Sequence, residues 1–236
     1  MLVVVLAMAS AFVLCSAIMS VFAVRLKPMT SPVSQTAITW MDSTVLQMVQ
    51  GEYSRNADLV KSSNAAGKRF DFVLYGDSIT VFHAADPSVM QRYHPNAAAL
   101  GVRGNTLEQL AWRIFQGQER LVPDPKIVAV HIGVNNLLQS KRDPSTRMRE
   151  FLAALKKTYP TSRLVVMALL PTSRPEARSS IANVNQAYKG ACADEGVTFA
   201  QCGSDLVPGS DAMPDGLHPS AYGQDRVHEC LRKLIY

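Results

Sequence analysis

Short, almost continuous apolar runs alternate along the chain with longer stretches in which apolar residues recur every three or four positions. Continuous apolar runs are typical of strands buried on both faces of a sheet. Five of them predict strands at residues 70–76, 97–102, 126–133, 163–171 and 197–202. The spacing of three and four is that of amphipathic helices. It predicts helices over residues 106–121, 144–160, 175–196 and 220–236.

The order of these elements predicts an α/β fold. Strands joined by helices form βαβ units, in which neighbouring strands run parallel and helices cover both faces of the sheet. Ligands of such sheets bind at the carboxyl ends of the strands. We therefore expect functional side chains just after the predicted strands.

The first 26 residues are nearly all apolar, and Met1 to Val24 contain no charged side chain. A helix of that length spans a hydrocarbon core of about 30 Å, so residues 1–26 are a predicted transmembrane anchor or signal segment. A basic n-region is absent, although Val21-Phe22-Ala23 would suit cleavage; we favour an uncleaved anchor. Arg25 and Lys27 then favour a domain on the cytoplasmic-like side, whereas cleavage would make the protein secreted or organellar.

The remaining chain divides into a predicted linker at residues 27–41, rich in Pro, Ser and Thr, and one domain at residues 42–236. A net charge of +5 and a pI near 9.1 favour contact with anionic surfaces such as lipid headgroups or acidic polysaccharide. The positive residues are scattered and no nucleic-acid motif accompanies them. We therefore expect no nucleic-acid partner.

The soluble part holds three cysteines, Cys192, Cys202 and Cys230, and the fourth, Cys15, lies in the apolar segment. An odd number argues against a disulfide framework. Cys192 and Cys202 could pair in an oxidising compartment, but we favour buried free thiols. The spacing matches no metal signature, so no metal ion is expected.

Ser78 follows the first predicted strand, where backbone N–H groups and a helix dipole can stabilise a developing anion. The alternative is that Ser78 or Asp77 only caps a helix. A nucleophilic serine needs a histidine base and a carboxylate that orients it. Asp215 and His218, in "MPDGLHPSAYG", are spaced so that one turn brings the carboxylate near the imidazole. The alternative there is a surface histidine beside an ordinary turn.

Two further strand ends carry candidate donors for an oxyanion. Gly104 in "LGVRGNT" follows the second strand, and a glycine lets a backbone N–H approach a ligand closely. Asn135 in "HIGVNN" follows the third strand and offers a side-chain amide. Each could alternatively be a turn residue. Agreement among four strand ends favours function.

These motifs together resemble the SGNH/GDSL hydrolase family from Phe70 to the C-terminus. "YGDSIT", "GVRGNT", "GVNN" and "DGLHP" look like its four blocks, while "ALLPTSR" and "NVNQAYK" look like its platelet-activating factor acetylhydrolase-like branch. Ile79 and Asn136 depart from the Leu and Asp that the family often has. The resemblance implies a three-layer, flavodoxin-like α/β sandwich with a five-stranded parallel sheet, here preceded by an N-terminal apolar helix.

The resemblance also implies a serine esterase that hydrolyses carboxylic esters of a lipid or acylated carbohydrate through an acyl-enzyme, without metal or cofactor. Its catalytic residues would be Ser78, Asp215 and His218, and its oxyanion hole would be formed by Ser78, Gly104 and Asn135. One alternative is acyl transfer to a hydroxyl group. Another is a membrane-anchored accessory or structural subunit of a larger membrane complex, using this fold without turnover.

The remaining candidates are single residues. Arg103 could meet a substrate phosphate or carboxylate, although a solvated loop charge is the more usual role. We expect His83 and His94 at the surface or in loops, and His131 as a core histidine within the third strand.

Overall fold

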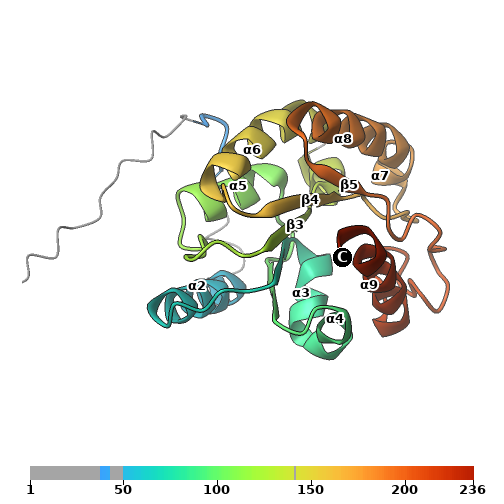
Figure 1. The fold of residues 1–236 in the computed structure, drawn as a ribbon. Helices are drawn as coiled ribbons and strands as arrows, with labels where there is room; N and C mark the ends of the chain where they lie inside the picture. Colours follow the sequence, from blue (N-terminus) through green and yellow to red (C-terminus); the bar gives the residue numbers. More distant parts are fainter. Residues whose placement is uncertain (1–37, 43–49, 141) are drawn as a thin grey trace, which may run out of the picture. The chain divides into compact units, whose positions relative to one another are not determined.

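The computed structural model describes residues 38–42, 50–140 and 142–236, which form a sheet with helices on both faces (Figure 1). The predicted apolar helix and anchor at residues 1–26, with most of the predicted linker, lie outside the described residues. No helix within the described ranges is long and apolar enough to cross a membrane.

The five predicted strands are confirmed, and all of them run parallel in the order β2-β1-β3-β4-β5. Each is shorter than the apolar run that predicted it, because the run extends past the strand at one or both of its ends. The strands are β1 (Phe72–Gly76), β2 (Ala97–Gly101), β3 (Ile127–His131), β4 (Arg163–Met167) and β5 (Thr198–Ala200).

The four predicted helices form, with two differences in their bounds. The predicted helix over residues 175–196 is interrupted at Ser179 and Ser180, and that over residues 106–121 ends at Phe115, just before Gly117. Helices α2, α3 and α4 are additional to those four, and the pattern missed α2 because its buried face includes polar residues such as Asn56 and Ser63. The helices are α2 (Gln50–Ala65), α3 (Ser78–Ala85), α4 (Pro87–Tyr93), α5 (Leu107–Phe115), α6 (Ser145–Thr158), α7 (Pro175–Arg178), α8 (Ile181–Glu195) and α9 (Ala221–Ile235), with one π-helical turn, η1 (Asn136–Ser140).

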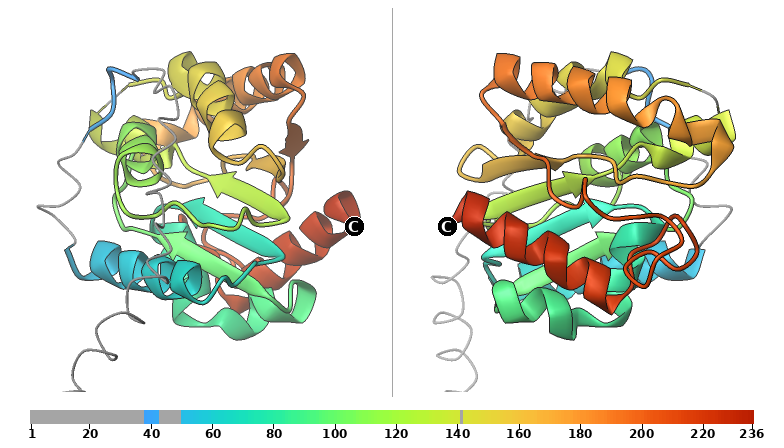
Figure 2. Two further views of the ribbon diagram at one scale, coloured as in Figure 1. Left: turned by 60° about the vertical axis from the view of Figure 1, so that its left-hand side comes forward. Right: turned by 90° about the vertical axis from the view of Figure 1, so that its right-hand side faces the viewer.

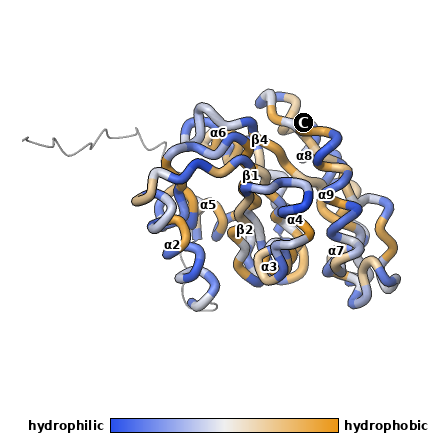
Figure 3. Tube along the Cα trace, turned by 60° about the horizontal axis from the view of Figure 1, so that its bottom comes forward, coloured by the Kyte–Doolittle hydropathy of each residue, from blue (hydrophilic) through white to orange (hydrophobic). Residues whose placement is uncertain are grey.

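Alternate strand residues point to opposite faces of the sheet, which creates two apolar cores. Val73 and Tyr75 face the layer of α5, α6 and α8, whereas Phe72 and Leu74 face the layer of α3, α4 and α9. The two helical layers lie on opposite sides of the sheet in both views of Figure 2. Hydrophilic and hydrophobic positions alternate along α9, as expected for a helix with one buried side (Figure 3). The sheet order and layers are those of the predicted flavodoxin-like sandwich.

Part of the predicted linker packs against the domain. Ile38 is buried, and the Trp40 indole N–H donates a hydrogen bond of 2.6 Å to Glu150 Oε2 on α6. The Arg147 guanidinium lies 5.7 Å from the centre of the Trp40 ring. Residues 38–41 therefore contribute contacts to the domain that was predicted to begin at residue 42.

Four histidines lie buried in or beside the layer of α3, α4 and α9. The predicted surface or loop position is wrong for His83, which is buried on α3, whereas His94 lies in the loop after α4, as predicted, but is buried there with His228. His228 Nε2 lies 3.1 Å from His83 Nδ1, and His94 stacks on Phe72. Burial lowers the pKa of His83 to about 3 and that of His94 to about 4. His131 is a core residue of β3, as predicted, and burial lowers its pKa to about 4.

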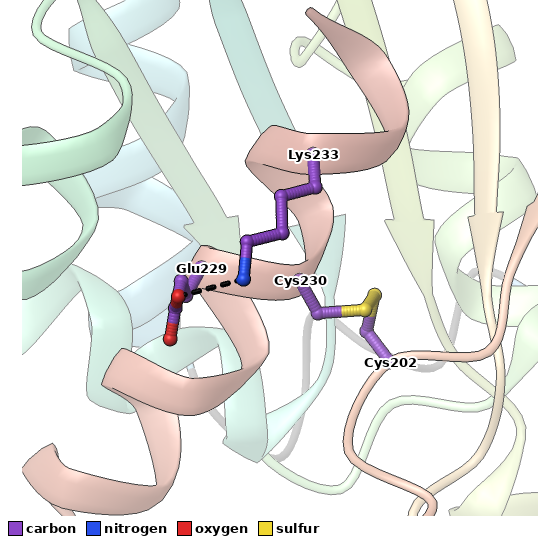
Figure 4. Close-up of a disulfide and its surroundings, with 4 residues drawn as sticks. All are labelled: Cys202, Glu229, Cys230 and Lys233. Carbon is purple, nitrogen blue, oxygen red and sulfur yellow. Dashed lines mark hydrogen bonds and ion pairs between the residues drawn. A yellow bond between two sulfur atoms is a disulfide. The ribbon is translucent and has the colours of Figure 1, made fainter.

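A disulfide joins Cys202, which follows β5, to Cys230 on α9 (Figure 4). The expectation that these two thiols are free is therefore wrong, and the alternative pairing of Cys192 with Cys202 does not form. The pairing depends on how α9 packs against the sheet, because the two cysteines are 28 residues apart but their Cα atoms lie only 5.7 Å apart. Cys192 is a buried free thiol, as predicted.

Candidate active site

The sequence left two roles open for Ser78, nucleophile or helix cap, and the structure assigns the cap to its neighbour at the end of β1. Asp77 is the N-cap of α3 and accepts a hydrogen bond of 3.0 Å from the Ile79 N–H. Ser78 is the first residue of the helix, and its hydroxyl is free to bond elsewhere. Gly76 must lack a side chain, because a Cβ would overlap the Thr80 hydroxyl and the His131 carbonyl.

Ser78, His218 and Asp215 lie in one hydrogen-bonded row. Ser78 Oγ is 2.9 Å from His218 Nε2, and His218 Nδ1 is 2.6 Å from Asp215 Oδ2. The other oxygen of Asp215 accepts the N–H groups of Leu217, at 2.9 Å, and of His218, at 2.7 Å. Partial burial raises the pKa of Asp215, but the bonds from His218 and Leu217 outweigh it and lower the pKa to about 2. Asp215 is therefore an anion at neutral pH.

The turn that carries Asp215 and His218 is held by the segment after β4. The Thr172 hydroxyl and the Ser173 N–H each donate a hydrogen bond of 2.9 Å to the carbonyl of Gly216. On the other side, the ring of Phe82 from α3 lies 4.9 Å from the ring of His218. The imidazole is thereby fixed between α3 and the end of β4.

Asn135 and Gly104 follow β3 and β2, the strands on either side of β1, and Gln139 bridges them. Asn135 Nδ2 donates to the Asn105 carbonyl at 3.0 Å and to Asp77 Oδ2 at 3.3 Å. Gln139 Nε2 donates both to Asn135 Oδ1 and to the carbonyl of Gly104, each at 3.3 Å. Gly104 has a φ of +72°, which favours glycine. The structure thus links the ends of β1, β2 and β3.

These strand ends coincide with the switch point of the sheet. From β1 the chain crosses to β2 on one side, and from β2 it returns past β1 to β3 on the other. Such a reversal leaves a crevice at the carboxyl ends, where ligands of α/β sheets bind. Ser78 follows β1 and Asn135 follows β3, so both lie at that position.

Arg113 supports these strand ends and was missed in the sequence, where it resembles the exposed side of an amphipathic helix. Its side chain is fully buried and forms an ion pair with Glu119, which is also fully buried. Arg113 Nη1 donates to the Gly76 carbonyl at 3.0 Å and to Asn105 Oδ1 at 2.9 Å. Nη2 donates to the Leu100 carbonyl at 2.7 Å. One guanidinium therefore fixes the chain before Asp77 and after Gly104.

Asp77 carries an unusual protonation equilibrium. Burial raises its pKa to about 7, against the lowering effect of the Ile79 N–H and of the Arg113 charge. The carboxyl that caps the nucleophile helix and accepts from Asn135 thus changes charge near neutral pH.

Two other residues singled out in the sequence have structural partners. Arg103 forms an ion pair with Glu52 of α2 and is a half-exposed loop charge. Asn136 Oδ1 accepts from the Leu107 N–H at 2.9 Å, and its Nδ2 donates to Glu108 Oε2 at 2.7 Å, so it secures the start of α5. Within the described part of the chain, no three His, Cys, Asp or Glu side chains are grouped to hold a metal ion.

Comparisons with known proteins concern the family and the fold of the chain. The model of the GDSL-like Lipase/Acylhydrolase family matches residues 74–226. Platelet-activating factor acetylhydrolase IB subunit alpha1 of Rattus norvegicus is 25% identical over 184 residues, which cover 73% of this chain and 78% of that protein.

Two solved structures share the fold. One is a protein of Streptococcus pneumonia provisionally named as a platelet activating factor; it has a TM-score of 0.67 at 17% identity and covers 83% of this chain and 100% of that chain. The other is a catalytic mutant of an acetylxylan esterase from Geobacillus stearothermophilus, with a TM-score of 0.56 at 18% identity, covering 70% of this chain and 94% of that chain.

Proposed function

The chain belongs to the GDSL-like Lipase/Acylhydrolase family and is a carboxylic ester hydrolase, and on that premise we propose that it cleaves acyl esters of a lipid or of an acylated carbohydrate through an acyl-enzyme. One observation carries the proposal: the hydrogen-bonded row from Ser78 Oγ through His218 to Asp215. This is the arrangement that activates a serine for attack on a carbonyl.

In the proposed mechanism, Ser78 Oγ attacks the ester carbonyl while His218 Nε2 takes the hydroxyl proton. Asp215, already an anion, holds the Nδ1–H and stabilises the imidazolium that forms. The tetrahedral intermediate collapses, and the departing alcohol takes the proton from His218. Water then attacks the acyl-serine with His218 again as base, and the acid leaves from a restored Ser78.

The negative oxygen of each tetrahedral intermediate needs hydrogen-bond donors. We assign these to the N–H groups of Ser78 and Gly104 and to Asn135 Nδ2. Gln139 supports the orientation of Asn135, because it donates to the amide oxygen and leaves the nitrogen facing Asp77 and Asn105. The bond from Asn135 to Asp77 is the longer of the two, so this amide hydrogen is the one assigned to the oxyanion. Loss of one such donor typically costs about 10²–10³ in turnover.

The names of the compared proteins support a short acyl group. One is an acetylhydrolase for platelet-activating factor and another is an acetylxylan esterase. We therefore propose that the acyl group removed by this chain is acetyl or of similar length, whereas the alcohol portion is a lipid or a carbohydrate.

We also propose that residues 1–26 hold the hydrolase at a membrane. The absence of charge from Met1 to Val24 supports this. The test is to express the full chain and wash the membranes at high pH. Retention of the full chain and release of a chain lacking residues 1–26 are expected, and recovery of the full chain in the wash would contradict the proposal.

The test of ester hydrolysis compares the full chain with its Ser78→Ala variant on p-nitrophenyl acetate and p-nitrophenyl octanoate. We expect the substitution to lower kcat by about 10⁴-fold or more, since it removes the nucleophile. The acetyl ester should be the better substrate. Ser54→Ala, at an exposed position of α2, is the matched control and should retain full activity. Equal rates for the wild type and Ser78→Ala would refute the assignment.

A further inference from the structure

A cavity lies beside the candidate active site, at the carboxyl ends of β4 and β5. Its volume is about 630 Å³, a size typical of small-molecule sites. The floor is apolar and includes Leu169, Ile181 and Phe199. The rim is polar, and its side chains come from α7, α8 and the segment after β5: Arg178, Gln186, Lys189, Gln201 and Ser204.

The charged side chains that line this cavity are of one sign. Arg178 and Lys189 both line it, and among the described residues no aspartate or glutamate does. Arg178 and Lys189 lie one on α7 and the other on α8, and across the described residues neither makes an ion pair of 4.0 Å or less. Their charges therefore remain available to an anion.

The amide side chains of the lining divide into two kinds. Asn185 Oδ1 accepts from the Leu169 N–H at 2.7 Å, and its Nδ2 donates to the Leu169 carbonyl at 2.9 Å, so this amide is occupied in holding α8 to the end of β4. Gln186 and Gln201 are exposed at the rim. They can offer hydrogen bonds beside the two cations.

The cavity shares its wall with the turn that carries the base. Thr172 and Ser173 line the cavity, and both hold the carbonyl of Gly216, two residues before His218. A substrate whose carbonyl lies at Ser78 can therefore extend past His218 toward Arg178 and Lys189.

We propose that this cavity binds an anionic group, phosphate or carboxylate, carried by the alcohol portion of the ester; the inference rests on the proposed function. The two cations supply charge-assisted hydrogen bonds, which arginine forms with the planar geometry that both anions match. The apolar floor accommodates the carbon skeleton that bears the anion. The substrate class is thereby narrowed to acidic lipids or acidic carbohydrates.

Direct binding is tested on the full chain with Ser78→Ala, so that no ligand is consumed. Glycerol 1-phosphate, glucuronate and uncharged glycerol are titrated by calorimetry. We expect both anions to bind more tightly than glycerol, and the tighter of the two identifies the source of the charge. Arg178→Gln with Lys189→Gln should weaken anion binding by about tenfold.

The matched control is Arg55→Gln with Lys61→Gln, which removes the same charge from exposed positions of α2. It should leave the affinity unchanged. Equal affinity for glycerol and the anions, an unchanged affinity in the cavity variant, or an equal loss in the control would each overturn the proposal.

A kinetic measurement separates this proposal from the proposed function. With Ser78 present, 1-acetylglycerol 3-phosphate is compared with 1-acetylglycerol. The cavity variant should lower kcat/KM for the phosphate ester by about tenfold through KM and leave the neutral ester unaffected. If the wild type cleaved neither glycerol ester and also failed to cleave p-nitrophenyl acetate, the proposed function would be refuted. The titrations would still decide whether the cavity binds anions.

Discussion

Ser78 and Asn135 are positioned by a network of buried polar side chains, whereas Asp215 and His218 belong to a turn that is exposed to solvent. The side chains of Asp77, Arg113 and Asn135 are nearly or fully inaccessible. Those of Asp215 and His218 are 46% and 21% exposed. We call Ser78 and Asn135, with the buried residues that support them, the nucleophile half of the site, and Asp215 with His218 the base half. The side chains of the two halves are therefore held in different ways.

The difference follows from how each half is built. The nucleophile half is formed by the ends of three parallel strands, and their terminal carbonyls must be satisfied inside the protein. Arg113 does this for β1 and β2. The base half contains its own hydrogen bonds, from Leu217 and His218 to Asp215, within four residues. We expect substitutions in the polar network of the first half to affect the stability of the fold, and substitution of the exposed Asp215 side chain in the second half to affect mainly the chemistry.

The largest expected effect is that of Asp215→Asn. An asparagine cannot stabilise the His218 imidazolium and can favour the wrong tautomer, so kcat should fall by about 10³–10⁴-fold. The midpoint of thermal unfolding should change little, because the side chain is half exposed. Asp211→Asn, an exposed carboxylate in the same segment, is the control. A large fall in the midpoint of thermal unfolding of Asp215→Asn would contradict the proposed difference between the two halves.

The next effect is on the nucleophile half. Arg113→Met leaves the Glu119 carboxylate buried without its partner, which typically lowers the free energy of unfolding by about 3–5 kcal/mol. Urea unfolding measures this change. Arg149→Met, which breaks the exposed pair with Asp194, should cost about 1 kcal/mol at most. Adding Glu119→Leu to Arg113→Met should restore part of the loss. Similar costs for Arg113→Met and Arg149→Met would contradict the account.

A pH dependence comes from Asp77, whose pKa is raised from 3.8 to about 7 in the folded protein. Between these values the folded state holds a proton that the unfolded state releases, so this group makes the free energy of unfolding fall as pH rises from about 4 to about 7. Asp77→Asn removes that decline and can retain the cap of α3. The variant should be more stable than the wild type at pH 8, by at most about 4 kcal/mol, and equal to it near pH 4.

The measurement is urea unfolding of both proteins from pH 4 to pH 8. Contributions of the buried histidines cancel in the difference between them. Asp58→Asn, an exposed carboxylate of α2, should show no such trend. A difference that stays constant over the whole pH range would show that Asp77 does not titrate there.

The smallest expected effect is the loss of unfolding free energy when the disulfide around the base half is removed. The Cys202–Cys230 bond closes the segment that contains Asp215 and His218. Replacing both cysteines by alanine should lower the free energy of unfolding by about 3 kcal/mol, because the unfolded chain gains freedom. A reducing agent should destabilise the wild type by a similar amount and leave the double variant unchanged. No response of the wild type to reduction would contradict the pairing.

The sequence predicts most of the sheet and the residues that meet at its edge. The five strands are readable because most of their residues are apolar, and β1 and β3 are buried on both faces throughout. Ser78, His218 and Asp215 are readable because strand ends of a parallel sheet converge. Their proximity in the structure follows the prediction, while their roles await the substitutions above.

The supporting residues could not be predicted, because their environment is created by packing between distant segments. Arg113 and His228 lie in helices whose polar positions normally face solvent, and both are buried. The partner of Cys202 depends on the placement of α9. Helix α2 buries Asn56, which donates to the Gly101 carbonyl, so no apolar stripe marks its inner side. Hydrophobic periodicity reports none of these features.

The row that joins Ser78 to His218 spans 140 residues of sequence. During synthesis the ribosome releases the nucleophile, its cap and the strands of the switch point long before the base. A nascent chain that ends between Asn135 and His218 therefore contains the strand ends that carry Ser78 and Asn135 but lacks the base. The hydrolase can become active only when the segment that carries Asp215 and His218 has been added and packed, so its own translation sets the earliest time at which esters are cleaved.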